Sequence, residues 1–285
     1  MASDNILHSG VPSRTALKVA TQRAVHQLLD HPLIFDDPLA LRILGRQEAE
    51  ELREDPHRYN NPMQRGMRAH VIARSRLTED EFTRAAAAGV RQYVVLGAGL
   101  DTFAYRNPHE ALGLHLYEID HPATQQWKRE RLEEAGIGVP EGVTLLPVDF
   151  ESETIAGRLA EAGFRTDLPA CFSWLGVTMY LNEEAIMAPL RFVASLPRGT
   201  SITFDYQKVP TTPIEQVINQ MMRDMVAGVG EPMVSAFEPD ALRDKIAALG
   251  FGEIELWDGP LINARYFRRR NDGWHTFSNF LCARV

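Results

Sequence analysis

Residues 90–106 read VRQYVVLGAGLDTFAYR, and this stretch decides the fold that the sequence predicts. The apolar run 93–96 leads to Gly97 and Gly99, and a polar turn follows. A buried parallel strand of a doubly wound sheet meets its ligand in this way, because glycine lets the backbone approach where a Cβ atom would collide. A second apolar run, LHLYEID, ends on Asp120, twenty-one residues after Gly99, where an acidic residue would meet a ribose hydroxyl. The stretch therefore predicts a nucleoside site on a parallel sheet.

Thr102 bears on which nucleoside ligand fits best. A dinucleotide such as NAD needs a third glycine in the pattern G-x-G-x-x-G to seat its pyrophosphate, and Thr102 stands at that position. NAD-dependent oxidoreduction is therefore the weaker interpretation. A ligand that carries adenosine without phosphate needs only the close backbone approach and the acid on the ribose. S-adenosylmethionine is such a ligand.

The size and charge of the chain limit the class of protein. Its 285 residues and 32.0 kDa suit one catalytic domain with additions. The formal charge of −8 argues against a nucleic-acid surface, and the basic run Arg268 to Arg270 is expected to be a solvated hairpin turn. Without a membrane-spanning apolar stretch or the pattern of a signal peptide, a cytoplasmic protein with no membrane partner is expected. Cys171 and Cys282 lack metal-ligand spacing, which predicts buried thiols and no metal site.

The chain has different patterns before and after residue 88. Residues 1–88 carry helical periodicity and are expected to form an N-terminal cap, with a long helix from about 63 to 88 that Gly89 is placed to end. Strand-like and helix-like segments then alternate within residues 89–285, which predicts an α/β fold with a mostly parallel sheet. The predicted parallel strands lie near 92–97, 114–119, 143–148, 170–175 and 200–206.

Two later segments depart from this alternation. Residues 208–238 contain the helix-like stretch IEQVINQMMRDMVAG and a GEP turn, which we interpret as a lid. Met221, Met222 and Met225 on this segment suit an apolar substrate or pack into the core. FGEIELWDG and TFSNFLCARV look like two strands joined by a polar turn, so they are expected to close a seven-stranded sheet as an antiparallel hairpin.

The strand ends supply the candidate binding residues, because ligands of a doubly wound sheet bind beyond the carboxyl ends of its strands. Asp149 and Phe150 follow the third strand, where an acid suits the amino group of adenine and an aromatic ring can pack on it. A helix cap or a turn is the alternative for Asp149. The predicted cofactor contacts at the strand ends are Gly97, Ala98, Gly99, Asp120, Asp149, Phe150 and Leu175.

Three motifs taken together, LGAGLDTFAYR, YEIDHP and VDFE, resemble the leucine carboxyl methyltransferase family and its bacterial O-methyltransferase relatives. The resemblance implies a class I methyltransferase fold, which is Rossmann-like, and S-adenosylmethionine as the cofactor. It also implies that Gly97 and Gly99 form the glycine turn of the family, that Asp120 binds the ribose, and that Asp149 lies beside the adenine.

Two arginines of the helical cap match positions that bind the cofactor carboxylate in the family. Arg74, in IARSR, resembles the arginine that holds the methionine carboxylate, and Arg23, in QRAVH, is similar to a basic residue that assists it. Arginine suits this role because it grips a carboxylate through two parallel hydrogen bonds. For Arg23, a solvated position on an amphipathic helix is an equal alternative.

Leu175 departs from the family pattern. Where much of the family has glutamate in a sequence like AEGLLMYL, this chain reads SWLGVTMYL, with Leu175 at the position of the glutamate. A carboxylate near the amino group of the cofactor is therefore missing, and the contact must come from backbone carbonyls or another side chain. The departure favours a small-molecule acceptor over a protein carboxyl terminus. It also leaves open a non-catalytic module that binds the cofactor without turnover.

The chemistry of the reaction narrows the acceptor. Methyl transfer is an in-line displacement, so holding the nucleophile in place supplies most of the catalysis and a base is optional. None of the nine histidines follows the fourth or fifth strand at the place where an acceptor should lie, which favours a carboxylate or an acidic hydroxyl of a small, partly apolar metabolite. A base supplied by the cap remains compatible with the sequence, as does any oligomeric state. Tyr180 and Tyr206 follow these strands and either orient the acceptor or pack with a surface-directed hydroxyl.

Overall fold

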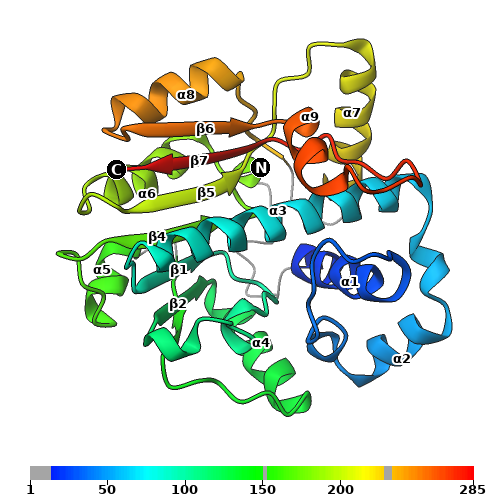
Figure 1. Ribbon diagram of the computed structural model, residues 1–285, viewed down its shortest axis with the longest axis horizontal. Helices are drawn as coiled ribbons and strands as arrows, with labels where there is room; N and C mark the ends of the chain where they lie inside the picture. Colours follow the sequence, from blue (N-terminus) through cyan, green and yellow to red (C-terminus); the bar gives the residue numbers. More distant parts are fainter. Residues whose placement is uncertain (1–13, 150–152, 228–232) are drawn as a thin grey trace, which may run out of the picture.

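The computed structural model describes residues 14–149, 153–227 and 233–285, and these residues build a seven-stranded sheet (Figure 1). Its strands are β1 (Gln92–Leu96), β2 (His115–Asp120), β3 (Val143–Pro147), β4 (Ala170–Trp174), β5 (Ser201–Asp205), β6 (Glu253–Trp257) and β7 (Phe280–Arg284). They are ordered β3-β2-β1-β4-β5-β7-β6. The first five in this order are parallel, whereas β7 runs antiparallel to both β5 and β6. The predicted α/β fold with a mostly parallel sheet is confirmed.

Helices cover both faces of this sheet. They are α1 (Arg14–Leu29), α2 (Arg46–Glu54), α3 (Pro62–Ala87), α4 (Pro122–Glu134), α5 (Ile155–Glu161), α6 (Glu183–Ala194), α7 (Pro213–Ala227), α8 (Pro239–Ala248) and α9 (Gly259–Ile262). Val94 and Leu96 of β1 belong to a core that includes α5, α6 and α8, whereas Tyr93 and Val95 belong to one that includes Phe82 of α3. Because successive side chains of a strand point to opposite faces, β1 is buried along its whole length. Figure 1 shows α3 crossing one face of the sheet, with α1 and α2 beyond it.

The long helix α3 begins and ends where local chemistry allows it. The side chain of Asn61 caps it by accepting a hydrogen bond from the N–H of Gln64 (3.0 Å). Gly89 follows its last turn with φ +96°, a conformation that residues with a Cβ atom rarely adopt. The chain then enters β1, and Phe82 of α3 stacks on Tyr93 with 4.2 Å between ring centroids. This packing fixes the helix against the strand that carries the glycine turn.

The two C-terminal strands pair as predicted, but the hairpin turn expected between them is wrong. Residues 258–279 join β6 to β7 through α9 and a π-helical turn, Asn263–Phe267. Arg270 was expected in a solvated turn, yet its side chain is 7% exposed, pairs with Asp272 (2.7 Å) and lies over the ring of Trp274 (4.7 Å). Trp274 is buried in a cluster with residues of α3 and β7. The connection is long because it packs this aromatic cluster.

Residues 208–238, which we interpret as a lid, contain α7. A parallel bridge between Lys208 and Phe237 brings the two ends of this segment together. Figure 1 shows α7 on the side toward which the parallel strands point. Met221 is half exposed, and the side chains of Met222 and Met225 lie outside the described part of the chain. A lid function for this segment and the division into a cap (1–88) and a larger domain (89–285) stay predictions.

Two further findings concern membranes and thiols. Across the described ranges, no helix combines the length and the apolar character needed to cross a membrane. Cys171 and Cys282 are free and buried, as expected.

Candidate active site

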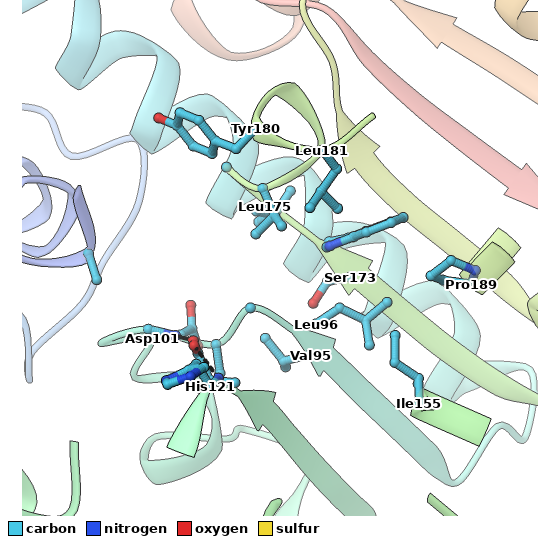
Figure 2. A pocket seen from close by; sticks show the side chains of 18 of the residues that line it. Val95, Leu96, Asp101, His121, Ile155, Ser173, Leu175, Tyr180, Leu181 and Pro189 are labelled. Carbon is cyan, nitrogen blue, oxygen red and sulfur yellow. Dashed lines mark hydrogen bonds between the residues drawn. The ribbon is translucent and has the colours of Figure 1, made fainter. Parts of the chain in front are cut away.

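A cavity of about 980 Å³ lies at the carboxyl ends of β1, β2 and β4, with α1, α3, α5 and α6 in its walls (Figure 2). This volume is near the upper end of the roughly 300–1,000 Å³ of ligand pockets. Figure 2 shows Asp101 and His121 at one end of the cavity and the apolar side chains of Leu96, Ile155 and Pro189 at the other. The cavity therefore has a polar and an apolar end.

Asp120 is held at the carboxyl end of β2 by two backbone N–H groups. The N–H of Gly99 donates to Oδ2 (2.6 Å) and the N–H of His121 donates to Oδ1 (2.7 Å). Burial raises the pKa of the Asp120 carboxyl, whereas these two hydrogen bonds favour its anion. Each carboxylate oxygen has a further lone pair with which it can accept a ligand hydroxyl. The carboxylate is thus oriented before any ligand arrives.

The glycine turn brings three residues, Gly97, Ala98 and Gly99, into the cavity wall. The N–H groups of Gly97 and Ala98 both donate to the carbonyl of Ile119 (2.8 and 3.0 Å), which ties β1 to β2. Gly97 and Gly99 have φ of +69° and +47°, a region that costs other residues free energy. A Cβ atom on Gly97 would also lie 2.4 Å from Cγ2 of Val177. Glycine is therefore required by both backbone and packing at position 97.

Asp149 lies just beyond β3 and lines the same cavity. Its N–H donates to Oε2 of Glu153 (2.8 Å), and its carbonyl accepts the N–H of Glu153 (2.8 Å). These two hydrogen bonds fix the backbone at the strand end. The structure thus brings Asp120 and Asp149 to one cavity, and the role of each toward a ligand stays a prediction. Phe150, the other residue predicted here, lies outside the described residues.

Arg74 reaches the cavity from α3 and is held by the end of β5. Its Nη1 donates to Oδ2 of Asp205 (3.1 Å), and Nε2 of His70 lies 3.1 Å from the same oxygen. The N–H of Gly176 donates to Oδ1 (2.6 Å). Burial alone would raise the pKa of Asp205, but Arg74 and His70 hold that pKa down to about 2. Within the described ranges, Nη2 of Arg74 has no hydrogen-bond partner, so the anchored guanidinium can still bind an anion.

Arg23 is buried, so the solvated alternative for this residue is wrong. Its side chain is 4% exposed, and Nε lies 3.2 Å from Oδ2 of Asp37. Nη2 donates to the carbonyl of Leu100, and Nη1 lies 3.9 Å from Asp101, both in the turn after β1. Arg23 also lines the cavity. It therefore stabilises the glycine-containing turn from α1, while a contact with the cofactor stays a prediction.

Leu175 and Tyr180 line the cavity, whereas Tyr206 is not among the described residues that do so (Figure 2). Leu175 places an apolar side chain in the cavity wall at the position where much of the family has a glutamate. Tyr206 is buried in the main core, where its ring centroid lies 6.5 Å from that of Phe204, and burial raises its pKa to about 12. We therefore assign Tyr206 to packing and retain only Tyr180 as a candidate for orienting the acceptor.

Asp205, Glu79 and Asp101 were not recognised as site residues from the sequence. Asp205 ends β5, so the rule that selected Asp120 could have selected it too. Asp101 lies within the quoted glycine motif, and Phe103 N–H donates to its Oδ1 (2.8 Å). Glu79 lines the cavity from α3, and burial raises its pKa to about 7 despite its pairing with Arg106. Glu79 reaches the cavity only because α3 packs against the turn after β1, so its role could be recognised only in the folded structure.

The sequence predicted no histidine near the acceptor, but the structure places His70 at the end of β5. No histidine directly follows β4 or β5 in the sequence, yet α3 carries His70 to the end of β5, where Nδ1 lies 2.5 Å from Oγ of Ser278. His121 lines the cavity, and its Nδ1 accepts the N–H of Ala123 (3.2 Å) as the N-cap of α4. Neither position was predicted as a source of a base.

The sheet order, with β7 inserted antiparallel between β5 and β6, and the cavity beyond β1 and β2 define a class I methyltransferase fold. Solved structures share this fold. A structure described as a putative methyltransferase from Thermobifida fusca superposes with a TM-score of 0.57 at 15% identity, covering 98% of this chain and 96% of its own. A DUF574 family protein from Streptomyces avermitilis gives 0.54 at 15% identity, covering 93% and 96%.

Sequence comparison places the chain within one family of this class. The model of the family named leucine carboxyl methyltransferase matches residues 16–194. The Bacillus subtilis protein named "Putative S-adenosyl-L-methionine-dependent methyltransferase YktD" is 32% identical over 93% of this chain and 94% of its own length. A Mycobacterium avium protein described as a putative S-adenosyl-L-methionine-dependent methyltransferase is 34% identical over 70% of this chain and 67% of its own length. The chain belongs to the leucine carboxyl methyltransferase family and is a methyltransferase.

Proposed function

We propose that this protein transfers a methyl group from S-adenosylmethionine to an oxygen atom of a carboxylate or hydroxyl on a small, partly apolar metabolite. One observation carries the proposal: the Asp120 carboxylate is oriented by the N–H groups of Gly99 and His121 in the cavity that Arg74 also lines. The acid suits the ribose of any nucleoside, whereas a guanidinium for a carboxylate is the contact that distinguishes this cofactor from a simple nucleoside.

The residues present fit this cofactor. Asp120 would hold the ribose hydroxyls, Asp149 the amino group of adenine, and Arg74 the carboxylate. The glycine turn lines the cavity, and the missing Cβ atoms of Gly97 and Gly99 let Val177 and Ala16 pack against this turn. When bound, the cofactor supplies a methyl group activated by a sulfonium. The protein then has to position the acceptor and exclude water.

The turn after β1 argues against a dinucleotide. Thr102 is fully buried, and its hydroxyl donates to Oδ2 of Asp37 (2.8 Å), so the position of the third glycine faces the protein interior. The chain continues as a three-residue 3₁₀ helix, Phe103–Tyr105, in place of a long helix whose N-terminus could bind pyrophosphate. Asp101 adds a negative charge to this turn, where a pyrophosphate would be repelled.

The remaining part of the cavity suits a partly apolar acceptor. Leu175, Leu181 and Val234 line it, together with Tyr180. An acceptor carboxylate, with a free pKa of roughly 4, is already ionised at neutral pH and needs no base. Positioning can then supply most of the rate enhancement. The segment that contains α7 would shield the reaction from water by closing over this end of the cavity.

The test is transfer of a labelled methyl group from S-adenosylmethionine to a panel of carboxylic acids, phenols and alcohols. We expect labelled methyl esters or ethers from partly apolar acids or acidic phenols, and calorimetric binding of S-adenosylhomocysteine. Tight cofactor binding without transfer to any panel member would favour the non-catalytic module. Binding of NAD without a response to either sulfur-containing ligand would contradict the proposal.

A further inference from the structure

A polar part of the cavity wall lies between α3 and the strands β1 and β4. The residues that line it include Ser75, Thr78, Glu79, Tyr93 and Ser173. Thr78 is 3% exposed, and within the described ranges its Oγ1 has no hydrogen-bond partner. Buried hydroxyl groups in native proteins are almost always hydrogen-bonded, because leaving one unpaired costs stability. An unpaired hydroxyl in a cavity wall therefore points to a polar group of a ligand.

Glu79, next to Thr78 on α3, belongs to a network of ion pairs that has more carboxylates than guanidiniums. The carboxylates and guanidiniums in this part of the described chain are Asp37, Glu79, Asp101, Arg23 and Arg106. Three carboxylates thus face two guanidiniums. Lys128 is balanced by Glu118, with 2.7 Å between Nζ and Oε2. Likewise, Arg74 is balanced by Asp205. A ligand with one positive charge would hold Glu79 in its ionised form, against the burial that raises its pKa to about 7.

We propose that Thr78 and Glu79 bind the α-ammonium group of the cofactor, while Arg74 binds its α-carboxylate. The inference rests on the proposed function. Arg74 and Thr78 are four residues apart on α3, so they share one helix face, and Glu79 follows directly and lines the same cavity. An amino-acid zwitterion carries opposite charges a few ångströms apart, and α3 contributes both a guanidinium and a carboxylate to the wall of the cavity.

The arrangement also accounts for Leu175. A leucine side chain cannot accept hydrogen bonds from an ammonium group. The groups that accept them have to come from another part of the cavity wall. Arg106 fixes the orientation of Glu79, because Nη1 of Arg106 donates to Oε2 (3.1 Å) and Nη2 donates to Oε1. Each oxygen keeps a second lone pair for an ammonium N–H. Helix α3 thus supplies the carboxylate that the loop after β4 lacks.

The inference is tested by calorimetry on the full chain with three ligands. These are S-adenosylhomocysteine, its analogue without the α-amino group, and methylthioadenosine, which lacks the whole amino-acid end. Thr78→Val and Glu79→Gln should each weaken binding of S-adenosylhomocysteine by about tenfold or more, since each removes a hydrogen bond to a charged group. Binding of the other two ligands should change little.

Asp80→Asn is the matched control, because Asp80 follows Glu79 on α3 but pairs with Arg76 (3.0 Å) and Tyr266 (2.8 Å). It should bind all three ligands as the unaltered protein does. Thr78→Val leaves the pair with Arg106 intact, so it tests the inference even if Glu79→Gln is unstable. Unchanged S-adenosylhomocysteine binding in both test variants, or an amine-specific loss only in Asp101→Asn, would overturn the inference. Failure of the unaltered protein to bind S-adenosylhomocysteine would count against the proposed function instead.

Discussion

The Asp120 end and the Arg74 end of the cavity are built in different ways. At the Asp120 end, the carboxylate ends β2 and the two N–H groups that orient it come directly after β2 and just after the neighbouring strand β1, the farther one 21 residues from Asp120. At the Arg74 end, the guanidinium comes from α3 and its anchor, Asp205, from the end of β5, 131 residues away. His70 and Gly176 complete that anchor from α3 and from the loop after β4.

This difference separates what a short motif can encode from what only a folded chain can assemble. A glycine turn and an acid at the end of the next strand form one unit, whose geometry follows from parallel strand pairing. The Arg74 end forms only when α3 packs across the sheet in the position that brings Arg74 to the end of β5. We expect the two ends to respond differently to substitution, and four experiments test this.

The largest effect is expected at the Asp120 end. Asp120→Ala removes the proposed acceptor for the ribose hydroxyls and leaves the N–H groups of Gly99 and His121 unpaired. We expect calorimetric affinity for S-adenosylhomocysteine to fall by about 100-fold or more, with methylthioadenosine affected as strongly, since both contain the ribose. Asp167→Ala, at a carboxylate that is 62% exposed, is the control and should bind normally. Affinity within a few-fold of normal in Asp120→Ala would remove this residue from the site.

A smaller and more selective loss is expected at the Arg74 end. Arg74→Ala should weaken S-adenosylhomocysteine by roughly 10–100-fold and leave methylthioadenosine nearly unaffected, because only the former has a carboxylate. Arg74→Lys keeps the charge but not the two-pronged geometry, so it should lie between the two. Circular dichroism and thermal melting check that the variant folds, since Asp205 loses its guanidinium partner. Equal losses for both ligands would contradict the carboxylate role.

The pH dependence of stability should distinguish the two ends by sign. The pKa of Asp205 is about 2, below its ordinary 3.8, so its ion pair contributes stability that is present above about pH 4 and lost as the pH falls toward 2. The difference corresponds to about 2 kcal/mol of unfolding free energy. The pKa of Asp120 is raised by burial, so its contribution has the opposite sign and favours the folded state at lower pH.

Urea denaturation at a series of pH values between about 2 and 6 measures these contributions. In the unaltered protein, the unfolding free energy should fall as the pH drops below about 4, and we call this part of the curve the acid limb. Asp205→Asn should make the acid limb flatter, because the amide no longer titrates. Asp120→Asn should leave that limb as steep or make it steeper. An acid limb that is unchanged in Asp205→Asn would show that the buried ion pair with Arg74 and His70 is not its cause.

The fold and the Asp120 end could be predicted from the sequence because their signals are local. Strand and helix patterns alternate after Gly89, and the glycine turn and Asp120 stand at the ends of successive apolar runs. The connection between β6 and β7 could not be predicted as a long packed segment, since Trp274 and Arg270 find partners only in the folded molecule. Glu79 and His70 were missed for the same reason. Each depends on which face of α3 meets the ends of the strands.

The smallest effect is expected from adding a single methyl group at the Arg74 end. This change shifts the position of the guanidinium without altering its charge. Gly176 has φ +72°, and a Cβ atom there would lie 2.6 Å from Nη1 of Arg74. Gly163 has φ +84° and nothing within 4 Å of such an atom. Both alanine variants should lose about 1–2 kcal/mol of stability, because each forces alanine into left-handed backbone. Only Gly176→Ala displaces the guanidinium, so it alone should weaken S-adenosylhomocysteine, by a few-fold to about tenfold, while methylthioadenosine binds both variants equally. If Gly163→Ala lost the same affinity, the effect would come from general destabilisation, and the position of Arg74 would not limit binding.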